Sequence, residues 1–188
     1  MRKFTDKEIL DRVTGLPGFR GFPNGMMDVW IRSRADTFDR FDDRAFTFEC
    51  FGDERAPRFV IARNGTTNAG SYGLLHYEQY NHAGCAVLKS DSIVYGSHAY
   101  GLHHGRPAYI QVKPFPYFRD ANRNKRADET GLVHNDIIGA NIHRAGQNST
   151  VIGNWSTACL VTAELSKFLA WLNVMKKHPL TVCIVKEW

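Results

Sequence analysis

Short runs in which apolar and polar residues alternate recur along this chain and restrict its fold more than any other feature. In the clearest run, 45–51, Phe46, Phe48 and Cys50 alternate with polar residues. A period of two places successive side chains on opposite faces of a β-strand. Similar runs predict strands at 28–33, 58–63, 85–88, 92–96, 108–113, 116–119 and 180–185. The 16 glycines and 7 prolines favour turns between them, so we expect mainly antiparallel β-structure.

The N-terminal segment predicts a helix. Thr5 and Glu8 have the spacing of a capping box, in which each side chain bonds the backbone N–H of the other residue. An apolar stripe with Ile9 and Val13 follows, and Gly15 and Pro17 mark the end of the helix.

The C-terminal segment 162–177 predicts a second, longer helix. Its spacing places Leu165, Leu169 and Leu172 on one face, joined by Phe168 and Trp171. His178-Pro179 ends the helix, because proline disfavours helical backbone at the preceding residue. The sequence therefore predicts an α+β fold, mainly antiparallel β, with an N-terminal helix and one longer C-terminal helix.

Composition restricts the partners of the chain. Its 24 Lys and Arg residues outweigh 19 Asp and Glu, which gives a formal charge of +5 and favours an anionic partner such as a cell wall. No stripe of basic residues interleaved with aromatics is present, so we expect no nucleic-acid binding. We also expect no transmembrane segment and no signal peptide. The chain is thus expected to be made in the cytoplasm and to reach any outside target by release or delivery.

The four cysteines are Cys50, Cys85, Cys159 and Cys183, and no two of them form a Cys-x-x-Cys pair, so a zinc ribbon is not expected. Cys50 and Cys183 lie in apolar runs, where buried thiols are common. Cys159 differs, because small residues precede it at 156–158.

His143 precedes Cys159 by sixteen residues. The segment 145–154 can loop out and return, so that the two side chains meet across neighbouring strands. A thiol beside an imidazole can act as a nucleophile, and the amides of Ala158 and Cys159 would hold an oxyanion. The alternative is a buried structural cysteine and a structural histidine, which the spacing taken alone favours because single Cys and His residues are common.

Several segments together resemble known motifs. His143, the sixteen-residue step and the segment 156–159 are similar to the active-site motif of the L,D-transpeptidase catalytic domain. The likeness is closer to a group of phage-encoded proteins taken to be peptidoglycan-degrading lysins. The matching segments are Gly101-Leu102-His103-His104-Gly105, Arg119-Asp120-Ala121-Asn122, Gly139-Ala140-Asn141-Ile142-His143-Arg144-Ala145 and Trp155-Ser156-Thr157-Ala158-Cys159. They lie within about 66–172, and the N-terminal third is not explained by the resemblance.

The length of 188 residues and the absence of a linker predict a single domain over 1–188. The resemblance implies that this domain is catalytic and forms an L,D-transpeptidase-like β-sandwich. It implies that Cys159 is the nucleophile, that His143 is the base, that the carbonyl of Arg144 orients the imidazole, and that the amide of Ala158 helps to hold the oxyanion. The residues implied to bind substrate are Asn141, Trp155, Ser156, His103 and His104. No cofactor and no metal ion is expected.

Two departures bear on the reaction. Ala158 stands where the family usually has glycine, which would strain the turn if that residue needs a positive φ. Val161 stands where many L,D-transpeptidases have a polar or basic residue, which weakens the case for cross-linking. We therefore expect a hydrolase of bacterial peptidoglycan stem peptides. The alternatives are an L,D-transpeptidase, and an inactive wall-binding or phage structural module. The oligomeric state is left open.

Two other groups of residues have side chains that could bind a metal ion. His98, His103 and His104 have no adjacent carboxylate and a poor spacing for zinc. Asp120, Asn122, Asn124 and Asp128 occupy positions one, three, five and nine of a calcium-loop pattern, but Lys125 replaces its glycine and Gly131 its glutamate. A turn capped by Asp and Asn side chains is the better interpretation of this loop.

Overall fold

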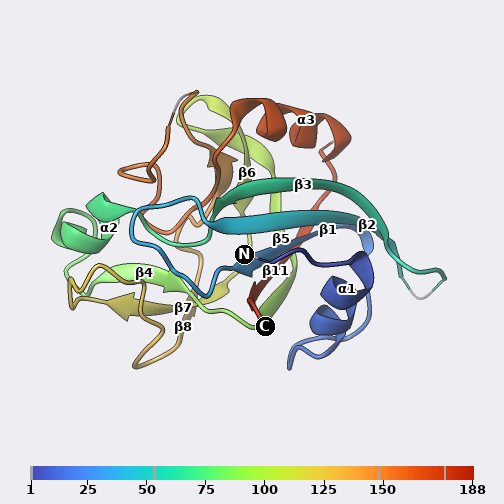
Figure 1. Cartoon of the computed structure of the whole chain (residues 1–188), viewed down its shortest axis with the longest axis horizontal. Coiled ribbons are helices and arrows are strands. Elements are labelled where there is room, and N and C mark those ends of the chain that lie inside the picture. Colours follow the sequence, from blue (N-terminus) through green and yellow to red (C-terminus); the bar gives the residue numbers. More distant parts are fainter. Residues whose placement is uncertain (1, 53, 148, 176) are drawn as a thin grey trace.

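The computed structural model describes residues 2–52, 54–147, 149–175 and 177–188, and most of its strands close into a barrel (Figure 1). Around the barrel the order is β1 (Asn24–Arg32), β11 (Leu180–Lys186), β5 (Ser92–His103), β6 (Arg106–Gln111), β9 (Ile142–Arg144), β10 (Leu160–Thr162), β3 (Arg58–Thr66) and β2 (Asp43–Phe51). A separate sheet has the order β4 (Cys85–Leu88), β7 (Phe115–Asp120) and β8 (His134–Asp136).

Most neighbouring strands are antiparallel, and β1–β11 and β9–β10 are parallel pairs. The expected α+β class, mainly antiparallel, is confirmed. The β-sandwich of two packed sheets, which the resemblance implies, does not form. Eight strands close into a barrel instead, in which β1–β11 and β9–β10 are the parallel pairs. Among the described residues, no helix has the length and apolar character needed to cross a membrane.

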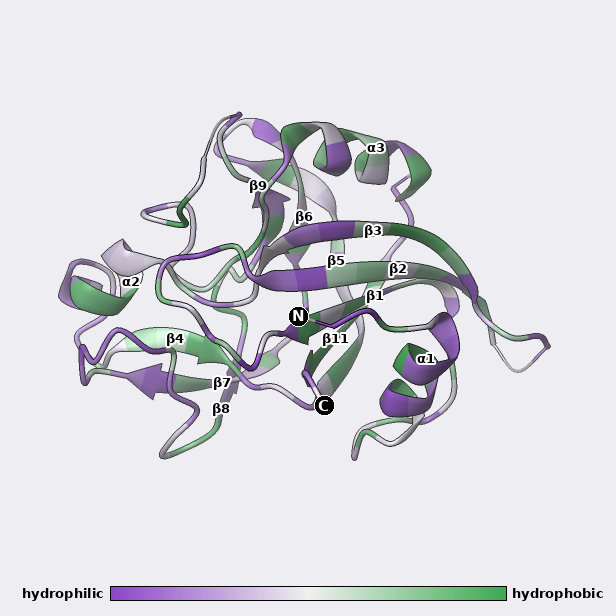
Figure 2. Ribbon diagram, in the orientation of Figure 1, coloured by the Kyte–Doolittle hydropathy of each residue, from purple (hydrophilic) through white to green (hydrophobic). Residues whose placement is uncertain are grey.

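The N-terminal helix α1 (Asp6–Thr14) begins as expected, with both hydrogen bonds of the capping box between Thr5 and Glu8. The helix carries hydrophilic residues alongside the apolar ones (Figure 2). Ile9 and Val13 are buried in a cluster with Met27 and Phe48, on the outer face of β1 and β2. The sequence prediction for this helix is confirmed.

Strand β1 is covered on both faces. Met26 and Trp30 belong to the central core cluster, whereas Met27, Val29 and Ile31, on the opposite face of the strand, pack in the cluster that includes residues of α1. The first 65 residues, which the resemblance does not cover, thus supply three of the barrel strands and the helix on their outer face.

The C-terminal helix α3 (Leu165–Met175) covers one end of the barrel (Figure 1). It starts three residues later than predicted, because Thr162 is the last residue of β10. Lys176, near the predicted end, lies outside the described residues. The buried face is formed by Phe168, Trp171 and Met175, whereas Leu169, expected on that face, is 53% exposed.

The barrel interior contains a buried ion pair. Arg63 donates to the Asp28 carboxylate, and both side chains are fully buried. Asp28 also accepts from the indole of Trp30 at 2.9 Å and from the hydroxyl of Thr47 at 2.6 Å. The Arg63 guanidinium lies 4.0 Å from the ring centroid of Trp171.

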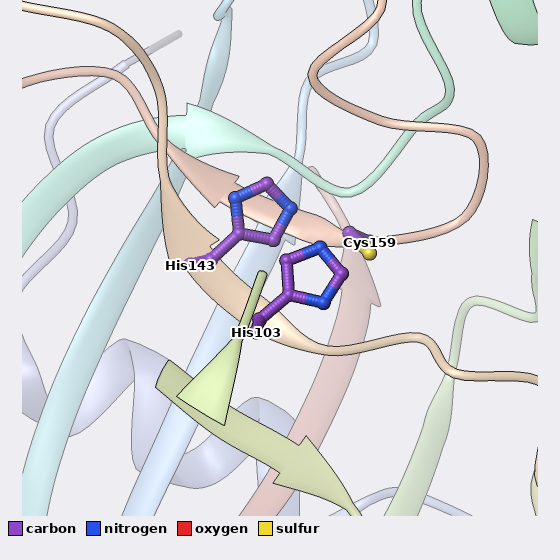
Figure 3. A group of neighbouring side chains, drawn as sticks. All are labelled: His103, His143 and Cys159. Atoms are coloured by element: carbon purple, nitrogen blue, oxygen red, sulfur yellow. The ribbon is translucent and has the colours of Figure 1, made fainter. Parts of the chain in front are cut away.

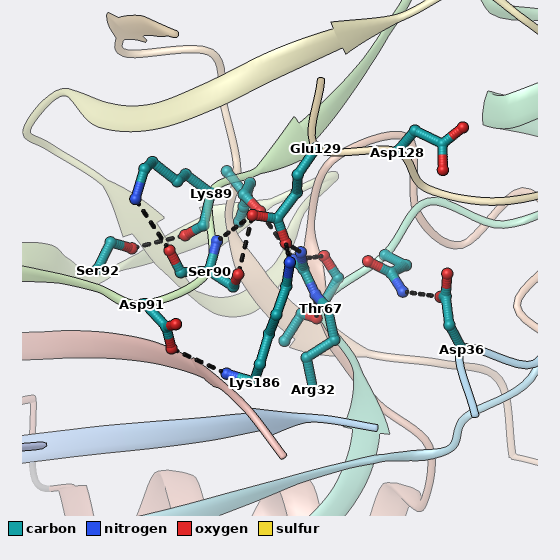
Figure 4. A network of polar contacts seen from close by, with 12 residues as sticks. Arg32, Asp36, Thr67, Lys89, Ser90, Asp91, Ser92, Asp128, Glu129 and Lys186 are labelled. Atoms are coloured by element: carbon teal, nitrogen blue, oxygen red, sulfur yellow. Dashed lines mark hydrogen bonds and ion pairs between the residues drawn. The ribbon is translucent and has the colours of Figure 1, made fainter. Parts of the chain in front are cut away.

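A second polar network links β1 to the loops around the small sheet (Figure 4). Arg32 is 5% exposed and pairs with Glu129 at 2.6 Å, while its Nε donates to Thr67 and its Nη2 to the carbonyl of Leu88. Glu129 also accepts from Ser90. A cavity of about 550 Å³ adjoins this network, and Arg32 and Glu129, which line it, neutralise each other.

Between β3 and β4 lie the short helix α2 (Ser71–Leu75) and the 3-10 turn η1 (Tyr77–Gln79). The carbonyl of Ser156 accepts from the N–H of Gly70, and the carbonyl of Gly153 accepts from the N–H of Tyr72. These bonds fasten α2 to the segment that leads into Cys159.

Candidate active site

Cys159 and His143 come together because their strands are neighbours. His143 is the middle residue of β9, Cys159 immediately precedes β10, and the two strands are parallel with Val161 opposite His143. The prediction that the two side chains meet across adjacent strands is confirmed. Figure 3 shows Cys159 close to the rings of His143 and His103.

A hairpin brings His103 to the same place. β5 and β6 are joined by His104 and Gly105, with φ of 49° and 73°, the left-handed conformation that a two-residue hairpin turn requires. β6 pairs with β9 through Tyr109 and Ile142, so the end of the hairpin lies beside His143. The rings of His103 and His143 stack with centroids 4.7 Å apart and 22° between their planes.

Hydrogen bonds determine which ring nitrogen of each imidazole carries the proton. Nδ1 of His143 lies 2.9 Å from the carbonyl oxygen of Arg144, so it carries the proton and leaves Nε2 with a lone pair. This Nε2 is buried and has no hydrogen-bond partner among the described residues. The role expected for the Arg144 carbonyl therefore agrees with the geometry.

Asn141 fixes the other imidazole. Its Oδ1 accepts from the backbone N–H of Gln111 at 2.9 Å, so its Nδ2 is the donor to Nδ1 of His103 at 3.1 Å. The neutral His103 ring then carries its proton on Nε2. Asn141, expected to bind substrate, is 7% exposed and serves here to orient His103.

The turn before Cys159 is held by Ser156, whose hydroxyl donates to the carbonyl of Cys159 at 2.8 Å. Ser156 is 1% exposed, so it organises the turn from beneath rather than facing a substrate. Ala158 does not adopt a positive φ, so its replacement of glycine causes no strain. In the described chain no backbone carbonyl bonds to the N–H of Ala158 or Cys159, which leaves both amides for an oxyanion.

Burial keeps the resting pair neutral. It raises the pKa of the Cys159 thiol to about 11, with the backbone N–H of Asn141 opposing the shift. It lowers the pKa of His143 to about 4, with the hydrogen bond to Arg144 opposing it and the nearby His103 adding to it. An ion pair would need a thiol pKa below that of the imidazole, so the resting site holds a neutral thiol beside a neutral imidazole.

Two buried residues support the segment that holds the thiol. Sγ of Cys159 lies 3.4 Å from the carbonyl of Gly139, to which it donates. Oε1 of Gln111 accepts from the N–H groups of Ile138 and Ala140, and the His98 ring lies 2.7 Å from the carbonyl of Ala140. Sequence reasoning missed Gln111, since a glutamine at the end of a strand carries no signal of this role.

Three side chains at this site could together bind a metal ion. One ring nitrogen each of His103 and His143 and Sγ of Cys159 lie within 4.8 Å of one another. Imidazole and thiolate are ligands that suit zinc or copper. This group is not the His98, His103 and His104 group of the sequence, because His98 is fully buried and its ring bonds the carbonyl of Ala140.

The remaining predicted residues lie around this centre. His104 is exposed, and its ring centroid lies 4.2 Å from that of His103. Trp155 is half-buried against the cluster of Ala145, Cys159 and Val161. Both remain available to a substrate.

The calcium-like loop bonds to itself. Asp120 accepts from the N–H groups of Asn122 and Asp128, and the side-chain amides of Asn122 and Asn124 donate to the Asp128 carboxylate. Amide nitrogens facing a carboxylate are the opposite of a cation-binding arrangement. The turn capped by Asp and Asn side chains, which the sequence favoured, agrees with these bonds.

Comparison of the chain with protein-family models, with curated proteins and with solved structures gave no match.

Proposed function

We propose that this chain is a cysteine-dependent hydrolase of peptidoglycan stem peptides. The observation that carries the proposal is the proximity of the Cys159 thiol to His143, whose Nε2 is free to take a proton. The free amides of Ala158 and Cys159 and the matching sequence segments around both residues support it. The stem-peptide substrate rests on the sequence resemblance alone.

In the acylation step, Sγ of Cys159 attacks the scissile carbonyl while its proton passes to Nε2 of His143. The C–N bond then breaks, and the proton moves from His143 to the leaving amine. The product is a thioester on Cys159. In the second step His143 takes a proton from water, whose oxygen attacks the thioester, and the proton returns to the thiolate as the acid product leaves.

Water is the favoured acceptor in this proposal. Val161, which replaces a polar or basic residue of many transpeptidases, is fully buried with Ala145 and Cys159. It therefore offers no polar contact to an acceptor amine. In an L,D-transpeptidase, the alternative, an amine would take the place of water, and in an inactive wall-binding module Cys159 would be dispensable.

The test is digestion of purified sacculi, with the muropeptides analysed by mass spectrometry. We expect shortened stems from the wild-type protein and none from Cys159→Ala or His143→Ala, because the two residues act as one unit. His82→Ala, at an exposed histidine, is the matched control and should retain full activity. Activity of Cys159→Ala equal to the wild type would refute the proposal.

Two additions to the digestion separate the alternatives. A D-amino acid acceptor should leave shortened stems as the chief product, whereas exchanged stems would indicate a transpeptidase. A chelator should leave the activity unchanged, because the mechanism uses a free thiol. Loss of activity with chelator and its return with zinc would instead indicate a metal enzyme built on His103, His143 and Cys159.

A further inference from the structure

A small cavity lies beside the nucleophile turn. It has a volume of about 210 Å³, and its lining includes Thr157 and Ala158 on one side and Ile138 on another. Ala158 directly precedes Cys159, and Ile138 directly precedes Gly139, whose carbonyl accepts from the thiol. A group bound in this cavity therefore lies against the turn that leads into Cys159.

Arg119 is the charged residue in this lining. Its side chain is half-buried on β7, where Nη1 donates to the carbonyl of Gly84 at 3.1 Å and Nη2 lies 3.4 Å from the hydroxyl of Tyr117. The guanidinium also packs over the Tyr117 ring, 4.9 Å from its centroid. These contacts fix the planar group in one orientation.

No carboxylate neutralises this charge. Within the described ranges Arg119 forms no salt bridge, whereas Arg63 pairs with the buried Asp28 and Arg32 with the partly buried Glu129. A positioned guanidinium with neutral neighbours favours an anionic ligand, and its fork of N–H donors matches the two oxygens of a carboxylate.

The rest of the lining suits a short apolar group. Tyr77 is 8% exposed and Tyr80 is 54% exposed, so one ring forms a wall and the other lies at the surface. The volume of about 210 Å³ is below the roughly 300–1,000 Å³ of pockets that enclose drug-sized ligands. It accommodates one small residue rather than a continuing peptide.

We infer that this cavity binds a carboxylate of the substrate through Arg119, one residue from the scissile carbonyl. The inference rests on the proposed function and narrows it, because the preferred substrate is a stem peptide with a free carboxylate at that distance. Two groups share this chemistry: the terminal α-carboxylate of the stem, and the side-chain carboxylate of its diamino acid.

The experiment compares a synthetic stem tetrapeptide with two analogues, one with a terminal carboxamide and one with an amidated diamino-acid side chain. Affinity is measured by NMR titration on the Cys159→Ala variant, and kcat/KM on the active protein. We expect wild-type cleavage to fall about 10- to 100-fold on the one analogue that lacks the recognised carboxylate, as for a lost charged hydrogen bond. The analogue that is affected identifies which carboxylate is bound.

Arg119→Gln should lower kcat/KM for the free acid by a similar factor. For the analogue that lacks the recognised carboxylate, kcat/KM of the variant should stay within about threefold of that of the wild type. Arg119→Lys keeps the charge but not the fork, and should give an intermediate loss. Arg126→Gln removes a charge from an exposed residue of the loop that follows β7 and should change neither value. Melting temperatures check that each variant is folded.

The inference is overturned if the wild type treats all three peptides alike, or if Arg119→Gln weakens them all equally. The affinity measurement separates this failure from that of the proposed function. If the free acid binds more tightly than the analogues but is not cleaved, the hydrolase proposal is refuted and the carboxylate site stands. If all three peptides are cleaved equally well, the carboxylate site is refuted and the hydrolase proposal stands.

Discussion

Cys159 is expected to react slowly with a small disulfide at neutral pH, at a rate that keeps rising up to about pH 10. Its pKa of about 11 leaves a thiolate fraction at pH 7 on the order of 10⁻⁴, against roughly 3% for an unperturbed cysteine. The deficit in thiolate is therefore ~300-fold. A more basic thiolate is a better nucleophile, with a Brønsted slope of about 0.4–0.5, which recovers roughly tenfold. Reaction some 20- to 30-fold slower than for free cysteine should remain.

The assay follows the absorbance of thiopyridone released from 4,4′-dithiodipyridine between about pH 6 and pH 10, where the rate should rise roughly tenfold per pH unit. Cys159→Ala supplies the background from the other thiols. Burial raises the pKa of Cys50 and of Cys85 to about 12 and that of Cys183 well above its usual value. By the same slope a thiol of pKa about 12 reacts only about threefold more slowly than Cys159, so this background is subtracted at every pH. A plateau below pH 7, or reaction faster than free cysteine, would show a thiolate–imidazolium pair and refute the neutral pair.

Three further predictions concern stability. Arg63→Met leaves the Asp28 carboxylate unpaired inside the barrel, so the free energy of unfolding in urea should fall by about 3–5 kcal/mol, and an unchanged midpoint would contradict this. Gly65→Ala would place a methyl group 2.3 Å from the carbonyl oxygen of Val161, so β3 and β10 must separate. The free energy of unfolding should fall by about 1–3 kcal/mol, and a lower melting temperature would show it. Burial lowers the pKa of His98 to about 4, so between about pH 6.5 and pH 4 the unfolded chain binds a proton that the folded chain does not. Stability from this residue, up to about 3 kcal/mol, is therefore lost as the pH falls through that window, and the difference in acid unfolding between wild type and His98→Gln should show it.

Local signals in the sequence predicted the elements that local interactions form. The capping box of Thr5 and Glu8 was found because its hydrogen bonds join residues three apart. Strands β8, β9 and β10 were not predicted, since each has three residues and is too short for a period to be read. The predicted helix includes Thr162 because the short strand β10 gives no periodic pattern in the sequence. Its pairing with Arg144 places Thr162 in β10.

The candidate site shows the same difference between features encoded locally in the sequence and features that depend on strand pairing. Cys159 and His143 were found from their spacing and from the residues around them. The stacking of His103 on His143 depends on the pairing of β6 with β9, which no local pattern encodes. The pKa shifts also lay beyond the sequence, because burial causes them and burial follows from the closed barrel.

The position of β11 in the barrel has a consequence for the order in which the chain is made. β11 comes last in the chain among the eight barrel strands, so it is the last of them to leave the ribosome, and it pairs with β1, the first of them, and with β5. Until it emerges, β1 and β5 each keep an open edge that can pair with other chains. Cys159 and His143 emerge earlier, and the strands that hold them, β9 and β10, pair with each other, with β6 and with β3 rather than with β11. The nascent chain therefore carries both its thiol and its imidazole before the barrel has closed.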